Sequence, residues 1–117
     1  MEVVLNNIKE LDKYIDFPNK TLIVIDSEVS KYYLDEFDYL KEKHNVYYYT
    51  LPNGENSKDI KFYLEIIEVL LKNSFSKSDL IIGIGGGVVG DVVGFVCATY
   101  KRGIPFILIP TTLLSKI

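Results

Sequence analysis

The stretch from Gly83 to Asp91 contains the residues whose spacing most directly indicates chemistry. Five of the eight glycines of the chain lie within these nine positions. Glycine leaves room for a phosphate to approach the backbone, and a helix that begins there directs its partial positive charge toward the anion. Gly85, Gly87 and Gly90 also fit the G-x-G-x-x-G spacing. Because an apolar run at 80–82 precedes the glycines and a helical pattern follows them, we predict a phosphate-binding turn between a buried strand and a helix.

Three other groups of polar residues come directly after apolar runs that we expect to be strands. They are Asp26, the segment 53–58, and the pair Thr111-Thr112. Ligands of open α/β sheets bind beyond the carboxyl ends of the strands. We therefore expect these groups and the glycine turn to gather at one edge of a sheet.

Two of these groups also have a purely structural interpretation. Asp26 could bind a ribose hydroxyl, or it could cap the N-terminus of a helix together with Ser27. Glu55 and Lys58 could present a carboxylate and an ammonium group to a ligand, or they could form a solvated ion pair. Both interpretations stay open at the level of the residues.

The same holds for the remaining candidates. The carboxylate of Asp91 could simply be stabilised by the positive end of its helix. A carboxylate beside a bound phosphate would, however, repel that phosphate unless the carboxylate faces a sugar or an amide of the ligand. This tension points to a ligand role for Asp91. The hydroxyls of Thr111 and Thr112 could donate to a ligand or merely end a strand. Lys101 and Arg102 could complement a helix dipole, or the guanidinium of Arg102 could form a bidentate hydrogen bond with a phosphate.

Apolar runs alternate with helical patterns along the chain. We expect strands at 21–25, 46–50, 80–84 and 106–109, and helices at 7–15, 29–43, 88–101 and from a cap at Ser57 onward. Strands separated by helices of this length form βαβ units with right-handed crossovers. The sequence therefore predicts an α/β fold, a Rossmann-like, doubly wound and mainly parallel sheet with helices on both faces, in one domain over residues 1–117.

Composition excludes several classes of function. The formal net charge is −3, whereas non-specific nucleic-acid binding requires a basic surface. No run approaches the length of an apolar membrane span, so we expect neither a nucleic acid nor a membrane as partner. The one cysteine, Cys97, fits a reducing compartment, and we expect a cytoplasmic protein with Cys97 in its core. The one histidine, His44, is expected in solvent, and no spacing suggests a metal site.

Two longer motifs make the glycine turn more specific. One extends from Gly85 through Asp91 and Arg102-Gly103 to the Pro-Thr-Thr-Leu-Leu segment at 110–114. The other is Pro-Asn-Gly-Glu-Asn-Ser-Lys at 52–58, which is similar to a P-x-G-E-x-x-K pattern. Both motifs, in this order, resemble 3-dehydroquinate synthase. The resemblance covers essentially the whole chain, but only the N-terminal, nucleotide-binding part of that family.

The resemblance implies a zinc- and NAD-dependent lyase of the shikimate pathway, which leads to the aromatic amino acids. Such an enzyme converts 3-deoxy-D-arabino-heptulosonate 7-phosphate to 3-dehydroquinate and phosphate. NAD takes a hydride from this sugar phosphate, phosphate leaves, the hydride returns, and the opened sugar closes by an aldol step. The resemblance also implies a homodimer in which Arg102 reaches the substrate of the neighbouring subunit. The residues implied to contact NAD are Asp26, Asn53, Gly54, Glu55, Asn56, Ser57, Lys58, Gly86, Gly87, Val88, Val89, Gly90, Asp91, Thr111 and Thr112.

The resemblance also sets limits. The family continues after the segment that 110–114 matches, with further substrate-binding residues and a helical domain that carries a glutamate and two histidines for zinc. No residue of this sequence matches those, so we assign it no zinc ligand and no catalytic residue and expect the truncated chain to be inactive alone. Two alternatives remain open. One is a fragment of a related sugar-phosphate cyclase or polyol dehydrogenase, and the other is a non-catalytic remnant or assembly partner.

Overall fold

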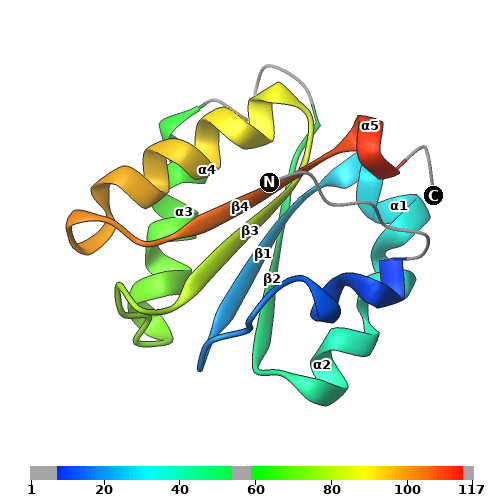
Figure 1. The fold of residues 1–117 in the computed structure, drawn as a ribbon. Coiled ribbons are helices and arrows are strands. Elements are labelled where there is room, and N and C mark those ends of the chain that lie inside the picture. The colour runs from blue at the N-terminus through cyan, green and yellow to red at the C-terminus, as the bar shows by residue number, and fades with distance from the viewer. Residues whose placement is uncertain (1–7, 54–58, 115–117) are drawn as a thin grey trace.

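The computed structural model describes residues 8–53 and 59–114, in which four strands form one parallel sheet (Figure 1). The strands are β1 (Thr21–Asp26), β2 (Val46–Leu51), β3 (Leu80–Gly85) and β4 (Phe106–Pro110), in the spatial order β2-β1-β3-β4. The helices are η1 (Ile8–Lys13), α1 (Ser27–Phe37), α2 (Tyr39–Lys43), α3 (Ile60–Lys72), α4 (Gly87–Thr99), η3 (Tyr100–Arg102) and α5 (Thr111–Leu114), and η1 and η3 are 3₁₀ helices. The predicted α/β fold is confirmed.

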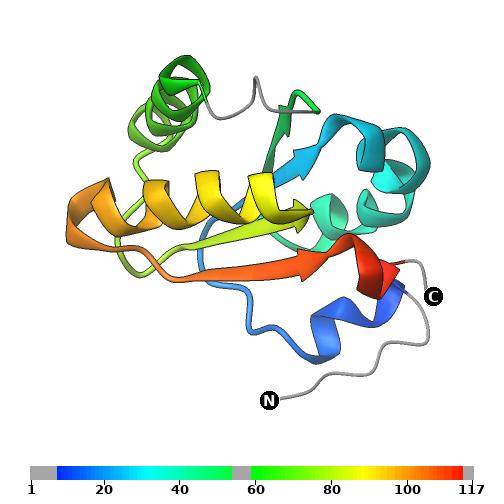
Figure 2. The ribbon, with the colours of Figure 1, turned by 90° about the horizontal axis from the view of Figure 1, so that it is seen from above.

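Helices cover both faces of the sheet (Figure 2). α3 and α4 pack on one face, and η1, α1 and α2 pack on the other. Successive side chains of a strand point to opposite faces. In the central strand β1, Leu22 and Val24 therefore contact the α3 and α4 side, and Ile23 and Ile25 contact the other side. All four are fully buried, which explains why this strand is a continuous apolar run.

The order of the strands reverses at the junction between β1 and β3. The chain leaves β1 toward β2 on one side, and it leaves β3 toward β4 on the other. The segments that follow β1 and β3 therefore diverge and leave a crevice at the carboxyl edge of the sheet. Asp26 ends β1 and Gly85 ends β3, so both predicted groups lie at this crevice.

Glycines allow α4 to lie close against the sheet. A Cβ added at Gly83 would lie 3.1 Å from Cγ2 of Val93 in α4. It would also lie 2.9 Å from Cδ2 of Leu108 in β4, and one added at Gly85 would lie 2.7 Å from Cγ2 of Val89 in α4. The separations of 2.9 Å and 2.7 Å are shorter than atoms tolerate without displacement, and Gly85 also has a positive φ of 156°. These two glycines are therefore required by packing, whatever the turn binds.

Two of the expected helices differ from the structure. The helix expected at 29–43 is two helices, because α1 ends at Phe37 and α2 begins at Tyr39. The hydroxyl of Tyr48 donates to the carbonyl oxygen of Phe37 (2.8 Å), an acceptor that a continuous helix would use for its own backbone. The helix expected at 7–15 is the 3₁₀ helix η1. Among the described helices, none combines the length and the apolar character that crossing a bilayer requires.

Two other helices begin or end at residues that differ from those expected. Ser57, the expected cap of α3, lies outside the described residues, and the carboxylate of Asp59 caps this helix by accepting the amide of Lys61 (3.1 Å). The helix expected at 88–101 begins at Gly87 and ends at Thr99. Lys101 then adopts a left-handed conformation with a φ of 45°, which interrupts the helical geometry.

Asp79 ties the start of β3 to the start of β1. Its side chain is buried, and its carboxylate accepts the amide of Lys20 (3.0 Å) and the amide of Ser76 (2.8 Å). Both amides would lose a charged acceptor if the carboxylate were removed, and a buried unsatisfied donor costs free energy.

We therefore expect the substitution Asp79→Ala to lower the free energy of unfolding by about 2 kcal/mol, measured by urea denaturation. The exposed neighbour Lys77 offers a control, because Lys77→Ala removes no buried partner and should change the stability by less than about 0.5 kcal/mol. Equal stabilities for the two variants would contradict this role of Asp79.

Candidate functional site

The exposed part of the glycine turn leaves space on its outer side. A Cβ added at Gly86 or Gly87 would meet no atom of the described residues within 4 Å. Gly86 is the N-cap residue of α4 and has no side chain to accept the amides of the first turn. The first bond of the helix runs from the amide of Gly90 to the carbonyl of Gly86 (3.1 Å). The preceding amides, those of Gly87, Val88 and Val89, therefore face the open end of the helix, where an anion could accept from them.

Two clefts open beside this turn. The first has a volume of about 370 Å³, and one predicted residue from the end of each strand lines it: Asp26, Asn53, Gly86 and Thr111. The second has a volume of about 360 Å³ and extends from the turn to Leu108, Pro110, Thr111 and Thr112. We call them the β1-side cleft and the β4-side cleft. For the described members, which are Asp26, Asn53, the glycine turn and the pair Thr111-Thr112, the expectation that these groups gather at one edge of the sheet is confirmed.

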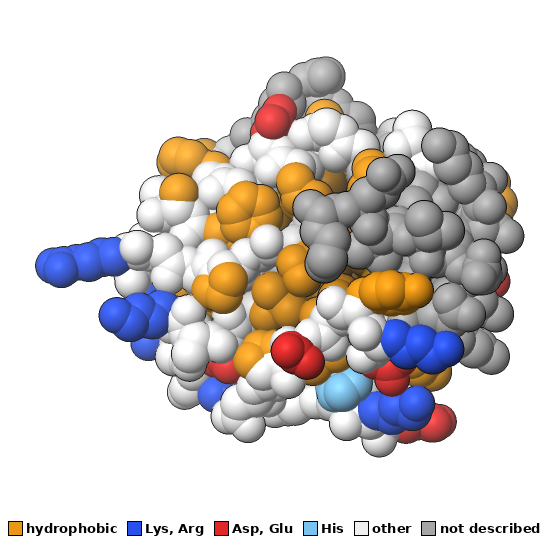
Figure 3. Space-filling model, viewed as in Figure 1, with side chains coloured by type: hydrophobic (Ala, Val, Ile, Leu, Met, Phe, Trp, Pro, Cys, Tyr) orange, Lys and Arg blue, Asp and Glu red, His pale blue; other side chains and the backbone are white. Residues whose placement is uncertain are grey.

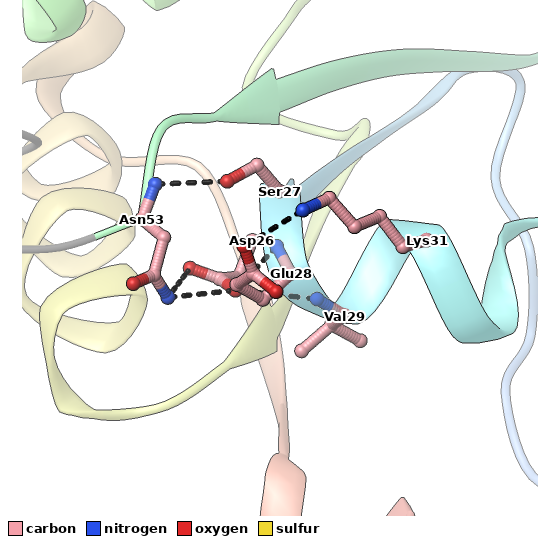
Figure 4. Close-up of polar contacts among 6 residues, drawn as sticks. All are labelled: Asp26, Ser27, Glu28, Val29, Lys31 and Asn53. Carbon is pink, nitrogen blue, oxygen red and sulfur yellow. Dashed lines mark hydrogen bonds and ion pairs between the residues drawn. The ribbon is translucent and has the colours of Figure 1, made fainter.

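Asp26 both caps α1 and contacts Asn53 (Figure 4). Its Oδ2 accepts the backbone amides of Glu28 (2.9 Å) and Val29 (3.3 Å). The side-chain amide of Asn53 donates to both carboxylate oxygens, at 3.0 Å to Oδ1 and 3.2 Å to Oδ2. The capping interpretation is therefore confirmed. Each carboxylate oxygen offers about two lone-pair positions, and among the described residues Oδ1 accepts only from Asn53, so Oδ1 retains one acceptor position at the β1-side cleft that Asp26 lines.

Ser27 has a role that differs from the expected one. It does not cap α1 but is the first residue of that helix, and its Oγ accepts the backbone amide of Asn53 (2.9 Å). Together with the Asp26 contact, this bond fixes both the backbone and the side chain of Asn53 at the end of β2 (Figure 4). Two residues predicted independently for the site are thus held together by direct hydrogen bonds.

Asp91 lies on a different side of α4 from the two clefts. It is the fifth residue of α4 and so lies beyond the first turn, where the helix dipole stabilises it little. The purely electrostatic interpretation of Asp91 is therefore wrong. Asp91 lines a third cleft of about 340 Å³ between the N-terminal ends of α3 and α4, together with Asp59, Tyr63 and Phe95.

Arg102 lies at the opposite end of the molecule from the glycine turn. The 13 residues of α4 separate the two, and such a helix is about 20 Å long. Figure 3 shows basic side chains projecting at the end where α4 and η3 end. Lys101 and Arg102 are exposed and both have positive φ values, 45° and 67°, which cost a non-glycine residue about 1 kcal/mol or more each. Arg102 therefore cannot contribute to the clefts of its own chain.

Five of the residues that the resemblance assigns to NAD lie outside the described residues: Gly54, Glu55, Asn56, Ser57 and Lys58. Conversely, the sequence analysis did not identify Glu28, which lines the β1-side cleft, or Tyr63 and Phe95, which line the third cleft. Glu28 forms an exposed ion pair with Lys31 (3.0 Å). A polar residue one position after a predicted cap could have drawn attention to Glu28, whereas exposed aromatics are indistinguishable from core residues in the sequence.

Cys97 and His44 do not contribute to the clefts. Cys97 is buried as expected, and burial raises the pKa of its thiol to about 12, so it stays protonated and unreactive near neutral pH. The expectation that His44 is solvated is wrong, because its half-buried ring stacks on Phe17 with centroids 4.2 Å apart.

We expect Asp26→Ala to lower the free energy of unfolding by about 2 kcal/mol, because it removes the cap of α1 and the partner of Asn53. Asp26→Asn should cost much less, because asparagine caps helices nearly as well. Glu36→Ala, which removes an exposed carboxylate of the same helix, is the control. A loss for Asp26→Asn as large as that for Asp26→Ala would show that the cap is not the main contribution.

Comparison with known proteins agrees with this geometry. The family model for the N-terminal part of 3-dehydroquinate synthase matches residues 48–117. The 3-dehydroquinate synthase of Streptococcus pyogenes is 45% identical over 98 residues, which is 84% of this chain and 28% of that protein. The bifunctional 3-dehydroquinate synthase/phosphatase of Fusobacterium nucleatum is 39% identical over 113 residues, 96% of this chain and 17% of that protein. The chain thus spans less than a third of the length of these curated relatives.

Solved structures share the fold. A 2-deoxy-scyllo-inosose synthase in complex with carbaglucose-6-phosphate, NAD⁺ and Co²⁺ superimposes with a TM-score of 0.76 at 23% identity, over 91% of this chain and 30% of that one. The 2-epi-5-epi-valiolone synthase of Streptomyces hygroscopicus, with NAD⁺ and Zn²⁺ bound, gives a TM-score of 0.66 at 26% identity, over 80% of this chain and 27% of that one. The family model matches residues 48–117, and the glycine turn and the converging strand ends agree with that match. This chain therefore belongs to the 3-dehydroquinate synthase N-terminal family.

Proposed function

We propose that this chain is the NAD-binding part of a 3-dehydroquinate synthase that acts on 3-deoxy-D-arabino-heptulosonate 7-phosphate. One observation carries the proposal. Gly86 and Gly87 leave open space at the N-terminus of α4, at the point where the two clefts and the ends of all four strands meet. A pyrophosphate placed there accepts hydrogen bonds from backbone amides without meeting a side chain.

The residues present fit an NAD molecule that spans the turn. The amides of Gly87, Val88 and Val89 would hold the pyrophosphate, and Val89 would contribute only its backbone because its side chain is buried. Asp26, held in place by Asn53, would accept a ribose hydroxyl in the β1-side cleft. When bound, NAD supplies a reversible hydride acceptor, and the role of this chain is to orient it.

Thr111 and Thr112 follow β4 and border the glycine turn. Thr111 lines both clefts and Thr112 lines the β4-side cleft. We propose that they hold the part of NAD nearer the substrate, and that Asp91, Glu55 and Lys58 contact NAD as the resemblance implies. Among the described residues, no group of His, Cys, Asp or Glu side chains is arranged to hold a metal ion, so we assign them no zinc ligand.

The glycine turn by itself does not select one substrate, because related cyclases share this turn. Both solved structures named above bear names of other cyclases, and one was solved with a sugar phosphate analogue. The curated relatives at 39–45% identity are 3-dehydroquinate synthases, and this greater similarity favours the heptulosonate phosphate. Because the zinc ligands implied by the family match no residue of this sequence, we propose that the 117-residue chain alone binds NAD without converting that substrate.

We further propose that the enzyme is a homodimer in which Arg102 serves the site of the partner. The position of Arg102 supports this assignment, because a full helix length separates it from the glycine turn of its own chain. Strained backbone at an exposed basic residue is typical of a functional position.

The glycine turn offers a test with a matched control. Gly87→Ala should leave the stability unchanged or slightly higher, because the new methyl group meets no described atom and alanine favours helices. It should weaken NAD binding at least about tenfold, equivalent to ~1.4 kcal/mol, because the methyl group occupies the space of a phosphate. Binding is measured by calorimetric titration of the chain with NAD.

Gly94→Ala is the control, since Gly94 lies in the same helix with equally open surroundings but away from the turn. It should bind NAD as the unaltered chain does. Unchanged NAD affinity in Gly87→Ala would reject this location of the cofactor. If the unaltered chain gave no heat with millimolar NAD, the non-catalytic alternative would be favoured.

A further inference from the structure

Leu108 has a side chain that is held in place by glycines and yet remains accessible. It lies in the middle of β4, which is an edge strand of the sheet (Figure 1). A Cβ added at Gly83 in β3 would lie 2.9 Å from Cδ2 of Leu108, and one added at Gly90 in α4 would lie 3.5 Å from its Cδ1. Each methyl group of Leu108 therefore lies beside backbone that carries no side chain. Leu108 is nevertheless 44% exposed, and it lines the β4-side cleft.

The two clefts beside the glycine turn differ in their chemistry. The residues that they share are Gly86, Gly87, Val89 and Thr111. The β1-side cleft also has the carboxylates of Asp26 and Glu28 in its lining. The β4-side cleft is instead lined by glycines, apolar side chains and threonines, and none of its described lining residues is charged. Pockets for small molecules are mostly apolar with a few polar groups, so the β4-side cleft, of about 360 Å³, suits a flat and weakly polar ring.

The position of Asp26 sets the direction in which a dinucleotide would lie across the turn. In dinucleotide sites of doubly wound sheets, an acid that ends the strand next to the glycine turn binds the ribose of the adenosine half. Asp26 ends β1, and β1 pairs with β3, the strand that leads into the turn. The adenosine half then belongs to the β1-side cleft and the pyrophosphate to the residues that both clefts share. The nicotinamide half reaches the β4-side cleft.

On the basis of the proposed function, we propose that Leu108 packs against one face of the nicotinamide ring in the β4-side cleft, and that Gly90 leaves the space for this ring. Because Gly83 and Gly90 already fix the position of the Leu108 side chain, little side-chain freedom is lost when the ring binds. Thr111 and Thr112 line the same cleft and carry hydroxyls, which are groups that can hydrogen-bond the carboxamide of the ring.

A comparison of NAD with ADP-ribose tests this contact, because ADP-ribose is NAD without its nicotinamide ring. Both ligands are titrated calorimetrically into the 117-residue chain, and we expect NAD to bind more tightly than ADP-ribose. Leu108→Ala should weaken the binding of NAD at least about fivefold, because it removes apolar contact area from the ring. The affinity for ADP-ribose should change by less than about twofold, because that ligand does not reach Leu108.

Gly90→Ala tests the space for the ring without damage to the fold. The added methyl group would be in ordinary contact with Leu108, and alanine favours helices, so the stability to urea should be unchanged or higher. The methyl group narrows the β4-side cleft, so we expect NAD to bind at least about fivefold more weakly and ADP-ribose to bind as before. Gly87→Ala gives the contrast, because at the pyrophosphate position it should weaken both ligands.

Phe106→Ala is the matched control. Phe106 lies two residues before Leu108, on the same face of β4, and is 43% exposed, but it is not among the residues that line the β4-side cleft. This variant should bind both ligands as the unaltered chain does.

Three results would overturn the contact between Leu108 and the ring while keeping the cofactor site. They are equal affinities of the unaltered chain for NAD and ADP-ribose, an equal loss of both ligands in Leu108→Ala, and an effect of Phe106→Ala as large as that of Leu108→Ala. An unaltered chain that binds neither ligand would reject the proposed function itself, and this contact with it.

Discussion

Close packing of α4 on β3 is the constraint on which the rest of this structure depends. Side chains are absent from β3 at Gly83 and Gly85, and Leu108 and Val89 occupy the space that Cβ atoms would need. Val89 is buried, so the first turn of α4 is anchored in the core by its own side chain. The helix N-terminus is thereby fixed over the junction of β1 and β3. Amides held in place before a ligand arrives lose little freedom when it binds.

At the end of β1, the carboxylate of Asp26 likewise has more than one structural role. Asp26 caps α1 with Oδ2 and holds Asn53 with both carboxylate oxygens, while the residue lines the β1-side cleft. Capping and ligand contact looked like alternatives in the sequence, but a carboxylate has enough acceptor positions for both. The capping bonds also fix the orientation of the side chain, which a ligand contact would require. The structural role therefore supports the proposed one instead of competing with it.

α3 shows why apolar pattern alone does not locate a core. Its apolar residues occupy most of the helix circumference, so the sequence indicates a strongly buried helix. In the structure Ile66 and Leu70 face the sheet, and Ile60, Leu64 and Leu71 face outward. Only the packing of α3 on the sheet separates the two sets. A similar division holds in β4, where Phe106 and Leu108 are 43% and 44% exposed although the run is as apolar as that of β1.

The sequence by itself determined the class of fold, the strands and the edge at which the polar groups gather. These follow from local causes: apolar runs form buried strands, glycines mark a tight turn, and parallel strands bring their carboxyl ends to one edge. Tertiary structure alone decided which glycines serve packing and which leave open space, because that depends on Val89 and Leu108 approaching from other elements. It also decided that Asp91 faces α3, that the helix at 29–43 breaks where Tyr48 takes the carbonyl of Phe37, and that Arg102 lies a helix length from the turn. Each is a contact or separation between segments distant in the chain, and such contacts leave no periodic trace in the sequence.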